Sequence, residues 1–338
     1  MPATTAHSDE HVGSLGIPYL FRYWQNVNAA YERQGEQTSR WDLDCTLLAG
    51  LNLNVLETAR FLNPKDRPSF DAFEDWIIAT NGGGMDEAEL VRLRAALAGD
   101  SVGSAAGSLD HVEGLTAQEL AFWDENGYVV VHDAIDPADR DAAAAAIYAF
   151  LDASPDDPSS WYGRKFGVSI WVPILRHPAF LANRRSPRLL KAFSQLWGCE
   201  DLWATVDQGG LNPPERHDWS FPGPHVHWDI TIASPHHFGV QGILYLTDTP
   251  ANQGAFSCIP GFHHRLAAWL RTLSPGTDPR KALAYEPGFV PIAGKAGDLV
   301  IWHHLLPHGS SPNSGRLPRV AQYVALRPTR WEYTEEWL

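Results

Sequence analysis

Apolar residues in the first hundred positions recur every three or four places, which is typical of helices with one buried face. In the last of these stretches, for example, Leu90, Leu93 and Leu97 fall on one stripe. Ser69 has the residue type of a helix N-cap and stands just before an apolar run. The pattern predicts helices over residues 19–33, 41–62, 70–80 and 86–97.

The pattern changes after residues 99–108, a Gly- and Ser-rich stretch with the composition of a linker. Beyond it, residues 118–125 and 137–153 keep helical spacing, and short apolar runs bounded by Pro and Gly follow. These runs predict strands over residues 128–131, 202–211, 240–247, 255–259, 289–292, 299–303 and 320–326. Many short strands separated by turns are typical of a sandwich or barrel. We therefore predict a helical N-terminal extension (14–98), a linker (99–108) and an α+β domain (109–338) built on a double-stranded β-helix, or jelly roll, with flanking helices.

Charge and composition narrow the class of protein. The 26 Lys and Arg residues face 40 Asp and Glu, and the resulting net charge of -14 disfavours binding to a nucleic-acid backbone. The three cysteines are too sparse for a disulfide framework or a zinc motif. Residues 1–13 lack the apolar centre of a signal peptide, and no apolar run approaches the length of a membrane span. We expect a globular cytoplasmic protein without nucleic-acid or membrane partners.

The candidate chemistry begins with His227 and Asp229, two residues apart in a segment that reads as extended. In a strand both side chains point to one face, where they reach the same metal ion. His225 shares that face, but only His227 forms the H-x-D pair, and such a pair often occurs by chance. His308, 79 residues after Asp229, would complete the two-histidine, one-carboxylate set of non-haem iron oxygenases.

The second half of the chain carries a more specific pattern. It reads Gln253-Gly254-Ala255-Phe256, Ile259-Pro260-Gly261-Phe262-His263, Gly297-Asp298, His308-Gly309-Ser310 and then Arg319. With these motifs in this order, about residues 109–326 resemble the phytanoyl-CoA dioxygenase family of Fe(II)- and 2-oxoglutarate-dependent oxygenases. Phe262 stands where this family usually has serine, and Gln253 where asparagine is common. Neither is a ligand position, so the departures bear on specificity and not on metal chemistry.

The resemblance implies that His227, Asp229 and His308 ligate Fe(II) and form the catalytic centre. It also implies that Arg319 binds the C5 carboxylate of 2-oxoglutarate. Arginine suits this role because its planar fork gives a carboxylate two charge-assisted hydrogen bonds. The neighbouring Arg316 belongs to the turn before Arg319 and is expected to be exposed to solvent.

Three further residues are candidates for holding the cosubstrate. Ser310 is two residues after His308 and would add a hydroxyl donor. Gln208 and Asn212 are four apart on a predicted strand and therefore share a face. Related hydroxylases use a Gln and an Asn upstream of H-x-D to hold the cosubstrate; ordinary strand polarity is the alternative. The histidine pairs at 236–237, 263–264 and 303–304 are interpreted as polar loop residues; the alternative is that one of them contacts substrate or orients a ligand through its second ring nitrogen.

The implied reaction is hydroxylation of an unactivated C–H bond of a small metabolite, coupled to decarboxylation of 2-oxoglutarate, with O2 as cosubstrate. Halogenation is disfavoured, because halogenating relatives lack the carboxylate that Asp229 supplies. One alternative is a cupin-like metal enzyme, an isomerase or hydrolase, that does not use 2-oxoglutarate and needs no fixed cation at Arg319. The other is a catalytically silent binding module, in which a ligand residue is expected to have been lost.

The substrate itself is left open by the sequence. The loops 160–166, 219–222 and 231–238 are expected to face it, and Arg164 and Lys165 among aromatic residues suit a small, partly polar or anionic molecule. The helical extension is expected to act as a cap or to join copies into a homo-oligomer, because its apolar stripes require a partner surface.

Overall fold

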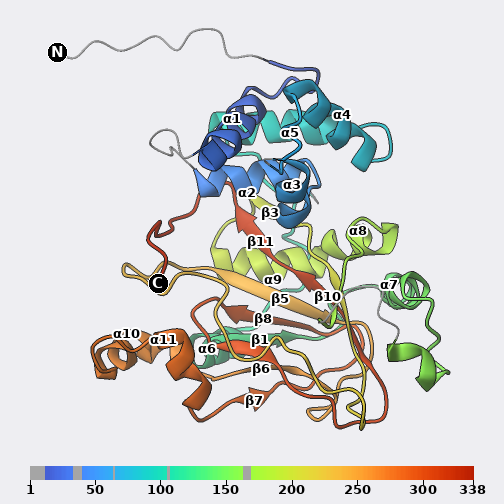
Figure 1. The fold of residues 1–338 in the computed structure, drawn as a ribbon, viewed down its shortest axis with the longest axis vertical. Coiled ribbons are helices and arrows are strands. Elements are labelled where there is room, and N and C mark those ends of the chain that lie inside the picture. The colour runs from blue at the N-terminus through green and yellow to red at the C-terminus, as the bar shows by residue number, and fades with distance from the viewer. Residues whose placement is uncertain (1–11, 33–39, 64, 105–106, 163–168) are drawn as a thin grey trace. The chain divides into compact units, whose positions relative to one another are not determined.

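The computed structural model describes residues 12–32, 40–63, 65–104, 107–162 and 169–338 (Figure 1). The chain divides into two compact units, one of Met1–Gly103 with Pro328–Trp331 and one of Ser104–Arg327 with Glu332–Leu338. The first division falls inside the Gly- and Ser-rich stretch. Within the described ranges, no helix combines the length and the apolar character needed to cross a membrane.

The first unit is built from helices. They are α1 (Pro18–Glu32), α2 (Trp41–Gly50), α3 (Val55–Phe61), α4 (Phe70–Thr80) and α5 (Glu87–Ala98). Their apolar stripes meet in a core where Leu20, Leu47, Phe73 and Leu93 are fully buried. Ser69 is the N-cap of α4, as predicted, since its side chain accepts a hydrogen bond from the Ala72 N–H at 3.2 Å.

The prediction of one helix over residues 41–62 is wrong. The chain turns between α2 and α3, where Asn52 adopts a left-handed conformation with φ of 53°. Asn54 then caps α3, because its side chain accepts from the N–H groups of Leu56 and Glu57 at 3.0 and 3.1 Å. Asparagine tolerates the left-handed region and favours caps, so these two residues outweigh the continuous apolar spacing.

The second unit contains the remaining elements. Its helices are α6 (Ala117–Asn126), α7 (Pro137–Phe150), α8 (Pro178–Arg184), α9 (Pro187–Trp197), α10 (Phe262–Thr272) and α11 (Pro279–Ala282), with 3-10 turns η1 (Pro158–Tyr162) and η2 (Leu283–Tyr285). Its strands are β1 (Tyr128–Val131), β2 (Trp171–Val172), β3 (Leu202–Ala204), β4 (Gly209–Asn212), β5 (Val240–Tyr245), β6 (Phe256–Cys258), β7 (Val290–Pro291), β8 (Leu299–His303), β9 (His308–Ser310), β10 (Arg319–Val324) and β11 (Leu326–Pro328). The mixed helix and strand content confirms the predicted class.

The strands form a larger and a smaller antiparallel sheet. The larger has the order β1-β8-β5-β10-β4-β2, the smaller the order β7-β6-β9, and β11 pairs separately with β3. The prediction of one strand over residues 202–211 is therefore wrong, because β3 and β4 belong to different sheets. Between them Thr205 donates its N–H to Ala325, at the point where β10 also gives way to β11.

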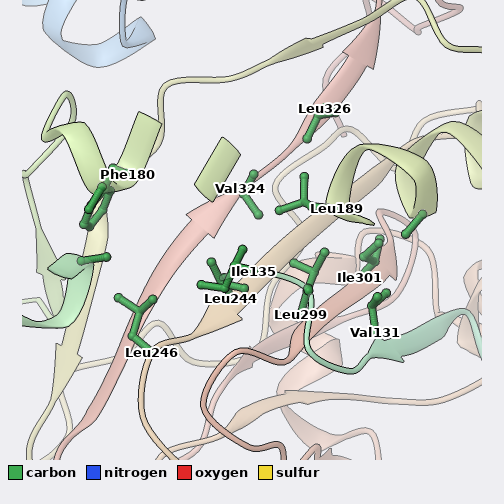
Figure 2. Close-up of a cluster of buried hydrophobic side chains, with 14 of the residues drawn as sticks. Val131, Ile135, Phe180, Leu189, Leu244, Leu246, Leu299, Ile301, Val324 and Leu326 are labelled. Atoms are coloured by element: carbon green, nitrogen blue, oxygen red, sulfur yellow. The ribbon is translucent and has the colours of Figure 1, made fainter. Parts of the chain in front are cut away.

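The two faces of the larger sheet bury different cores. Leu244, Leu299 and Ile301 pack on one face with residues of α7, α8 and α9, as Figure 2 shows for Phe180 and Leu189. Ile243 and Val300, one position along, join a second cluster that includes Phe256 and Cys258 of the smaller sheet. Because both faces are covered, β8 reads as a continuous apolar run. The second cluster is the one that surrounds the candidate site.

Candidate metal centre and adjoining cavity

The structure brings together His227, Asp229 and His308, which are distant in sequence. One possible ligand atom from each lies within 4.8 Å of the others, and across the described ranges this is the group of three or more such side chains close enough to hold a metal ion. Nε2 of His227 lies 3.1 Å from Asp229 Oδ1, and Nε2 of His308 lies 3.2 Å from Asp229 Oδ2. Two imidazoles and a carboxylate form a donor set suited to Fe(II) with open positions.

Backbone pairing fixes the spacing of the two histidines. The N–H of His227 donates to the carbonyl of His308 at 2.9 Å, and the N–H of His308 donates to the carbonyl of His227 at 3.0 Å. Gly309 permits this approach, because an added Cβ would lie 2.7 Å from the carbonyl oxygen of His225. His227 therefore forms an isolated β-bridge with His308, the first residue of β9.

The tautomers of both histidines follow from their backbone contacts. Nδ1 of His227 lies 2.7 Å from the His225 carbonyl, and Nδ1 of His308 lies 3.0 Å from the Leu306 carbonyl. A carbonyl only accepts, so Nδ1 carries the proton in each ring and Nε2 is left for Asp229 or a metal ion. His225 contributes its carbonyl and not its ring, which agrees with the choice of His227 from the sequence.

Charges in the group are strongly coupled. Burial acts to raise the pKa of Asp229, but hydrogen bonds and charge from His227 and His308 outweigh it and hold that pKa well below its usual range. Burial likewise acts to lower the pKa of His227, yet the hydrogen bond and charge of Asp229 raise it overall. The carboxylate is thus ionised, and a bound cation would compete with protons for Nε2.

Arg319 is a fully buried cation. Its Nη1 donates to Ser310 Oγ at 3.1 Å and its Nη2 to Tyr323 Oη at 3.4 Å, whereas its Nε has no partner. None of the described carboxylates forms an ion pair with it. A buried charge without a counter-ion is costly, so this arrangement suits an anion that is bound from outside. Arg316, by contrast, is exposed as expected.

A cavity of about 170 Å³ adjoins the metal group. His227, Asp229 and His308 line it, together with Ser310 and Tyr323, the two hydrogen-bond partners of Arg319. Other lining residues are Trp171, Asp207, Gln208, Pro224, Gln241, Gly242, Ile243, Phe256, Trp302, Gly309, Val324 and Ala325. The cavity is therefore bordered by the metal group, by the two side chains that bind Arg319 and by aromatic residues.

The two predicted amides are placed differently. Gln208 lines the cavity, just before β4. Asn212 is fully buried and does not line the cavity. Its side-chain Nδ2 donates to the Ser311 carbonyl at 3.2 Å, and its backbone carbonyl accepts from Nδ2 of Asn313 at 2.8 Å. The structure thus gives Asn212 contacts with the turn that follows β9.

Two residues near the metal group were missed by the sequence analysis. Gln241 on β5 donates its Nε2 to Asp229 Oδ2 at 2.7 Å. Arg280 on α11 donates to the carbonyls of Trp228 and Ile230, on either side of Asp229, at 2.8 and 2.6 Å. A polar residue inside an apolar strand was a signal for Gln241, whereas nothing local in the sequence marks Arg280.

The loops expected to face the substrate are only partly placed. Residues 163–168, with Arg164 and Lys165, lie outside the described residues. Within 219–222, Phe221 is buried and Trp219 packs edge-to-face on Tyr162 at 5.9 Å. Loop 231–238 is held by the C-terminal segment, since the Leu338 N–H donates to Thr231 Oγ1 at 3.1 Å. None of these described loop residues lines the cavity.

Comparison with known proteins adds a family assignment to this geometry. The sequence profile described as phytanoyl-CoA dioxygenase (PhyH) matches residues 123–321, more than half of the chain. A Dictyostelium discoideum protein that bears the phytanoyl-CoA dioxygenase name is 23% identical over 264 residues, covering 62% of this chain and 74% of the relative.

Solved structures with some likeness include the α-ketoglutarate-dependent carbocyclase SnoK of nogalamycin biosynthesis, with a TM-score of 0.47, 21% identity, and coverage of 65% of this chain and 86% of SnoK. HygX from Streptomyces hygroscopicus, with nickel and 2-oxoglutarate bound, has a TM-score of 0.44 and 16% identity, covering 64% of this chain and 88% of HygX. At these scores the likenesses assign no function to this chain.

Proposed function

Because this chain belongs to the phytanoyl-CoA dioxygenase family, whose members use Fe(II) and 2-oxoglutarate, we propose that it hydroxylates an unactivated C–H bond of a small metabolite. In this proposal His227, Asp229 and His308 hold the iron. Arg319 and Ser310 bind the C5 carboxylate of 2-oxoglutarate, and Gln208 contacts the cosubstrate from the cavity wall. The two sheets are proposed to form the jelly roll of the family.

The single observation that carries the proposal is the buried Arg319 beside a two-histidine, one-carboxylate group. A metal enzyme that does not use 2-oxoglutarate has no need of an unpaired cation here, whereas a dicarboxylate cosubstrate supplies its missing counter-ion. Ser310 links Arg319 to the cavity, because its side chain accepts a hydrogen bond from Arg319 and the residue lines the cavity beside the metal group. Fe(II) with 2-oxoglutarate and O2 supplies the oxidising power, and the protein supplies binding and orientation.

The protein's own residues then have defined tasks. Carbonyls of His225 and Leu306 keep both Nε2 atoms available for the ion, and Arg280 fixes the backbone around Asp229. Phe256 and Trp302, whose rings stack at 4.3 Å, form an apolar wall next to His308. Such a wall positions a C–H bond and keeps water from the reacting atoms.

The proposal is tested first by anaerobic spectroscopy of the purified protein with Fe(II), with and without 2-oxoglutarate. We expect a weak visible charge-transfer band that requires both additions and is absent in Asp229→Ala. Arg319→Met should still bind metal but need at least about 100-fold more 2-oxoglutarate, because it loses charge-assisted hydrogen bonds. Arg316→Met, the matched control at the exposed arginine, should behave like the wild type.

The remaining outcomes separate the alternatives. Wild-type protein that binds Fe(II) but shows no band with 2-oxoglutarate would favour a metal enzyme without this cosubstrate. Protein that binds no metal would favour a binding module. Where the band forms, small metabolites are screened by succinate release, and hydroxylation is recognised by a product one oxygen atom heavier.

We further propose that the first unit caps the enzyme or joins two copies of it. Its helices carry an aromatic cluster in which Phe61 and Trp76 stack at 4.5 Å and neither ring is fully buried. Analytical ultracentrifugation of the full chain tests the second role. We expect a dimer. A monomer at micromolar concentration would contradict the joining role, and the capping role would then be the proposal that stands.

A further inference from the structure

Gln241 reaches from β5 to the metal group. Its Nε2–H donates to Asp229 Oδ2 at 2.7 Å, a shorter contact than either histidine makes with that carboxylate. A carboxylate only accepts hydrogen bonds, so the amide must present its nitrogen and not its oxygen to Asp229. This orientation leaves Oε1 of Gln241 buried and without a donor.

Trp302 is the direct cross-strand partner of Gln241 in the register of β5 and β8. Side chains of such partners lie on one face of the sheet, with Cβ atoms about 5 Å apart. The indole Nε1–H of Trp302 is buried and has no acceptor. Its ring is held between Phe256, at 4.3 Å, and His308, at 5.1 Å. An unpaired donor and an unpaired acceptor thus belong to neighbouring side chains that line the same cavity.

We propose that Gln241 is a positioning residue for the carboxylate of Asp229, and that Trp302 sets the orientation of the Gln241 amide by donating to its Oε1 when the metal site is loaded. The inference rests on the proposed function, because it requires Asp229 to be a metal ligand.

The number of hydrogen-bond donors that face Asp229 would fall when a metal ion binds. In the metal-free protein, Asp229 faces Nε2 of His227 and of His308 as well as Gln241. In a loaded site both Nε2 atoms would face the ion and not donate to Asp229, so Gln241 would remain as the side-chain donor to Asp229 among these three. A reversed amide would place Oε1 against Oδ2, two acceptors facing each other. In the loaded site Trp302 would oppose that reversal, since its N–H would find an acceptor in Oε1 but not in the amide nitrogen.

The first test measures the affinity of the full-length protein for Co(II) alone, by calorimetry and by the visible spectrum of the bound ion. Gln241→Met keeps the length of the side chain and removes its donor, and we expect affinity to fall about 10- to 100-fold, the range for outer partners of ligands. The matched control is Gln195→Met. The Gln195 amide bonds the backbone of Leu115 at 2.6 and 3.0 Å, away from the cavity, so its loss should leave Co(II) affinity unchanged.

The second test is a double-mutant cycle. Trp302→Phe should weaken Co(II) binding by about 5-fold, the size of one hydrogen bond, and should add nothing in the Gln241→Met background. Trp197→Phe controls for the loss of an indole, because Trp197 Nε1 donates to the Leu326 carbonyl at 2.8 Å and lies in the other core. An equal effect of Trp302→Phe in both backgrounds would mean that Trp302 acts through its packing on His308, and would overturn the orienting role.

The outcomes also separate this inference from the proposed function. Wild-type protein that binds no Co(II) overturns both. Co(II) bound by the wild type but not by Asp229→Ala, with undiminished affinity in Gln241→Met, overturns the inference alone.

Discussion

Two groups of histidines lie in the second unit, and they are built in opposite ways. His227 and His308 face the carboxylate of Asp229, with ring centroids 4.6 Å apart. In the other group, His263 packs on His264 and His303 at 3.9 and 5.1 Å. Here Nε2 of His263 and Nε2 of His264 both lie within hydrogen-bond distance of a backbone carbonyl, that of Asp124, and not of a carboxylate.

The difference lies in what surrounds the rings of the candidate metal site and of the second group. A carboxylate between two rings raises the pKa of His227, whereas burial among other rings lowers the pKa of His303 to about 2 and that of His304 to about 4. Burial thus favours the neutral form of His263 and of His303, and both rings serve as packing. Among the described residues, the group with the ligand types and spacing for a metal ion is His227, Asp229 and His308, and not the second group. Yet the rings of His263 and His264 lie as close to each other as those of His227 and His308.

The largest expected effect separates the two groups directly. His308→Ala removes a ligand, so Co(II) or Fe(II) affinity should fall by more than about 100-fold, beyond the usual effect of an outer partner. His264→Ala, at an exposed ring of the second group, should leave affinity unchanged. Calorimetric titration of both variants checks this. Equal losses would mean that the second group also contributes to the site.

Metal binding should also stabilise the protein through the first group alone. With free Co(II) at 100 times its dissociation constant, mass action adds about 2.7 kcal/mol to the free energy of unfolding of the wild type. Thermal unfolding with and without metal measures this. His308→Ala should show no shift, and His264→Ala should show the full one. A shift that persists in His308→Ala would point to a second binding site.

The sequence predicted the metal group because H-x-D and the later His308 belong to a pattern with fixed order. It could not distinguish the other histidine pairs by residue type, and interpreted them as loop residues; His263 and His264 in fact lie in α10 and His303 ends β8. Burial lowers the pKa of His263 and of His303, and that burial depends on the tertiary packing of segments that are distant in sequence, so no local pattern reveals it.

Local rules also set the limit of the fold prediction. Ser69 and the strand at β8 follow from short-range patterns and are correct. The break at Asn52 depends on the conformation of a single residue, and the break at Thr205 on pairing with a distant strand. Apolar periodicity therefore did not predict either of them. Helix α9 was not predicted, although Pro187 at its start and Gly198 at its end are the expected signals.

His303 of the second group and its chain neighbour His304 should make the protein sensitive to acid. A histidine in the unfolded chain has a pKa of about 6.5. Below that pH the unfolded chain binds protons at His303 and His304, whereas the folded protein keeps both rings neutral because burial lowers their pKa. The free energy of unfolding therefore falls as the pH falls. Each contributes about 2 kcal/mol of destabilisation by pH 5. His303→Asn keeps an acceptor for the Leu305 N–H and does not titrate. Urea unfolding of chelator-treated protein between pH 5 and 7.5 should show a decline about 2 kcal/mol smaller in this variant than in the wild type; an unchanged decline would contradict the assignment.

The smallest effect tests whether the second group is only packing. Gly127 ends α6 with φ of 74°, and an added Cβ would lie 2.6 Å from Nδ1 of His263. Gly198 ends α9 with φ of 69° and has open space around it. Both alanine variants lose about 1 kcal/mol through the left-handed backbone. Gly127→Ala should lose about 1 kcal/mol more, because the histidine ring must move. Co(II) affinity should be the same in both variants and in the wild type, and weaker binding in Gly127→Ala would mean that the two groups of histidines are coupled.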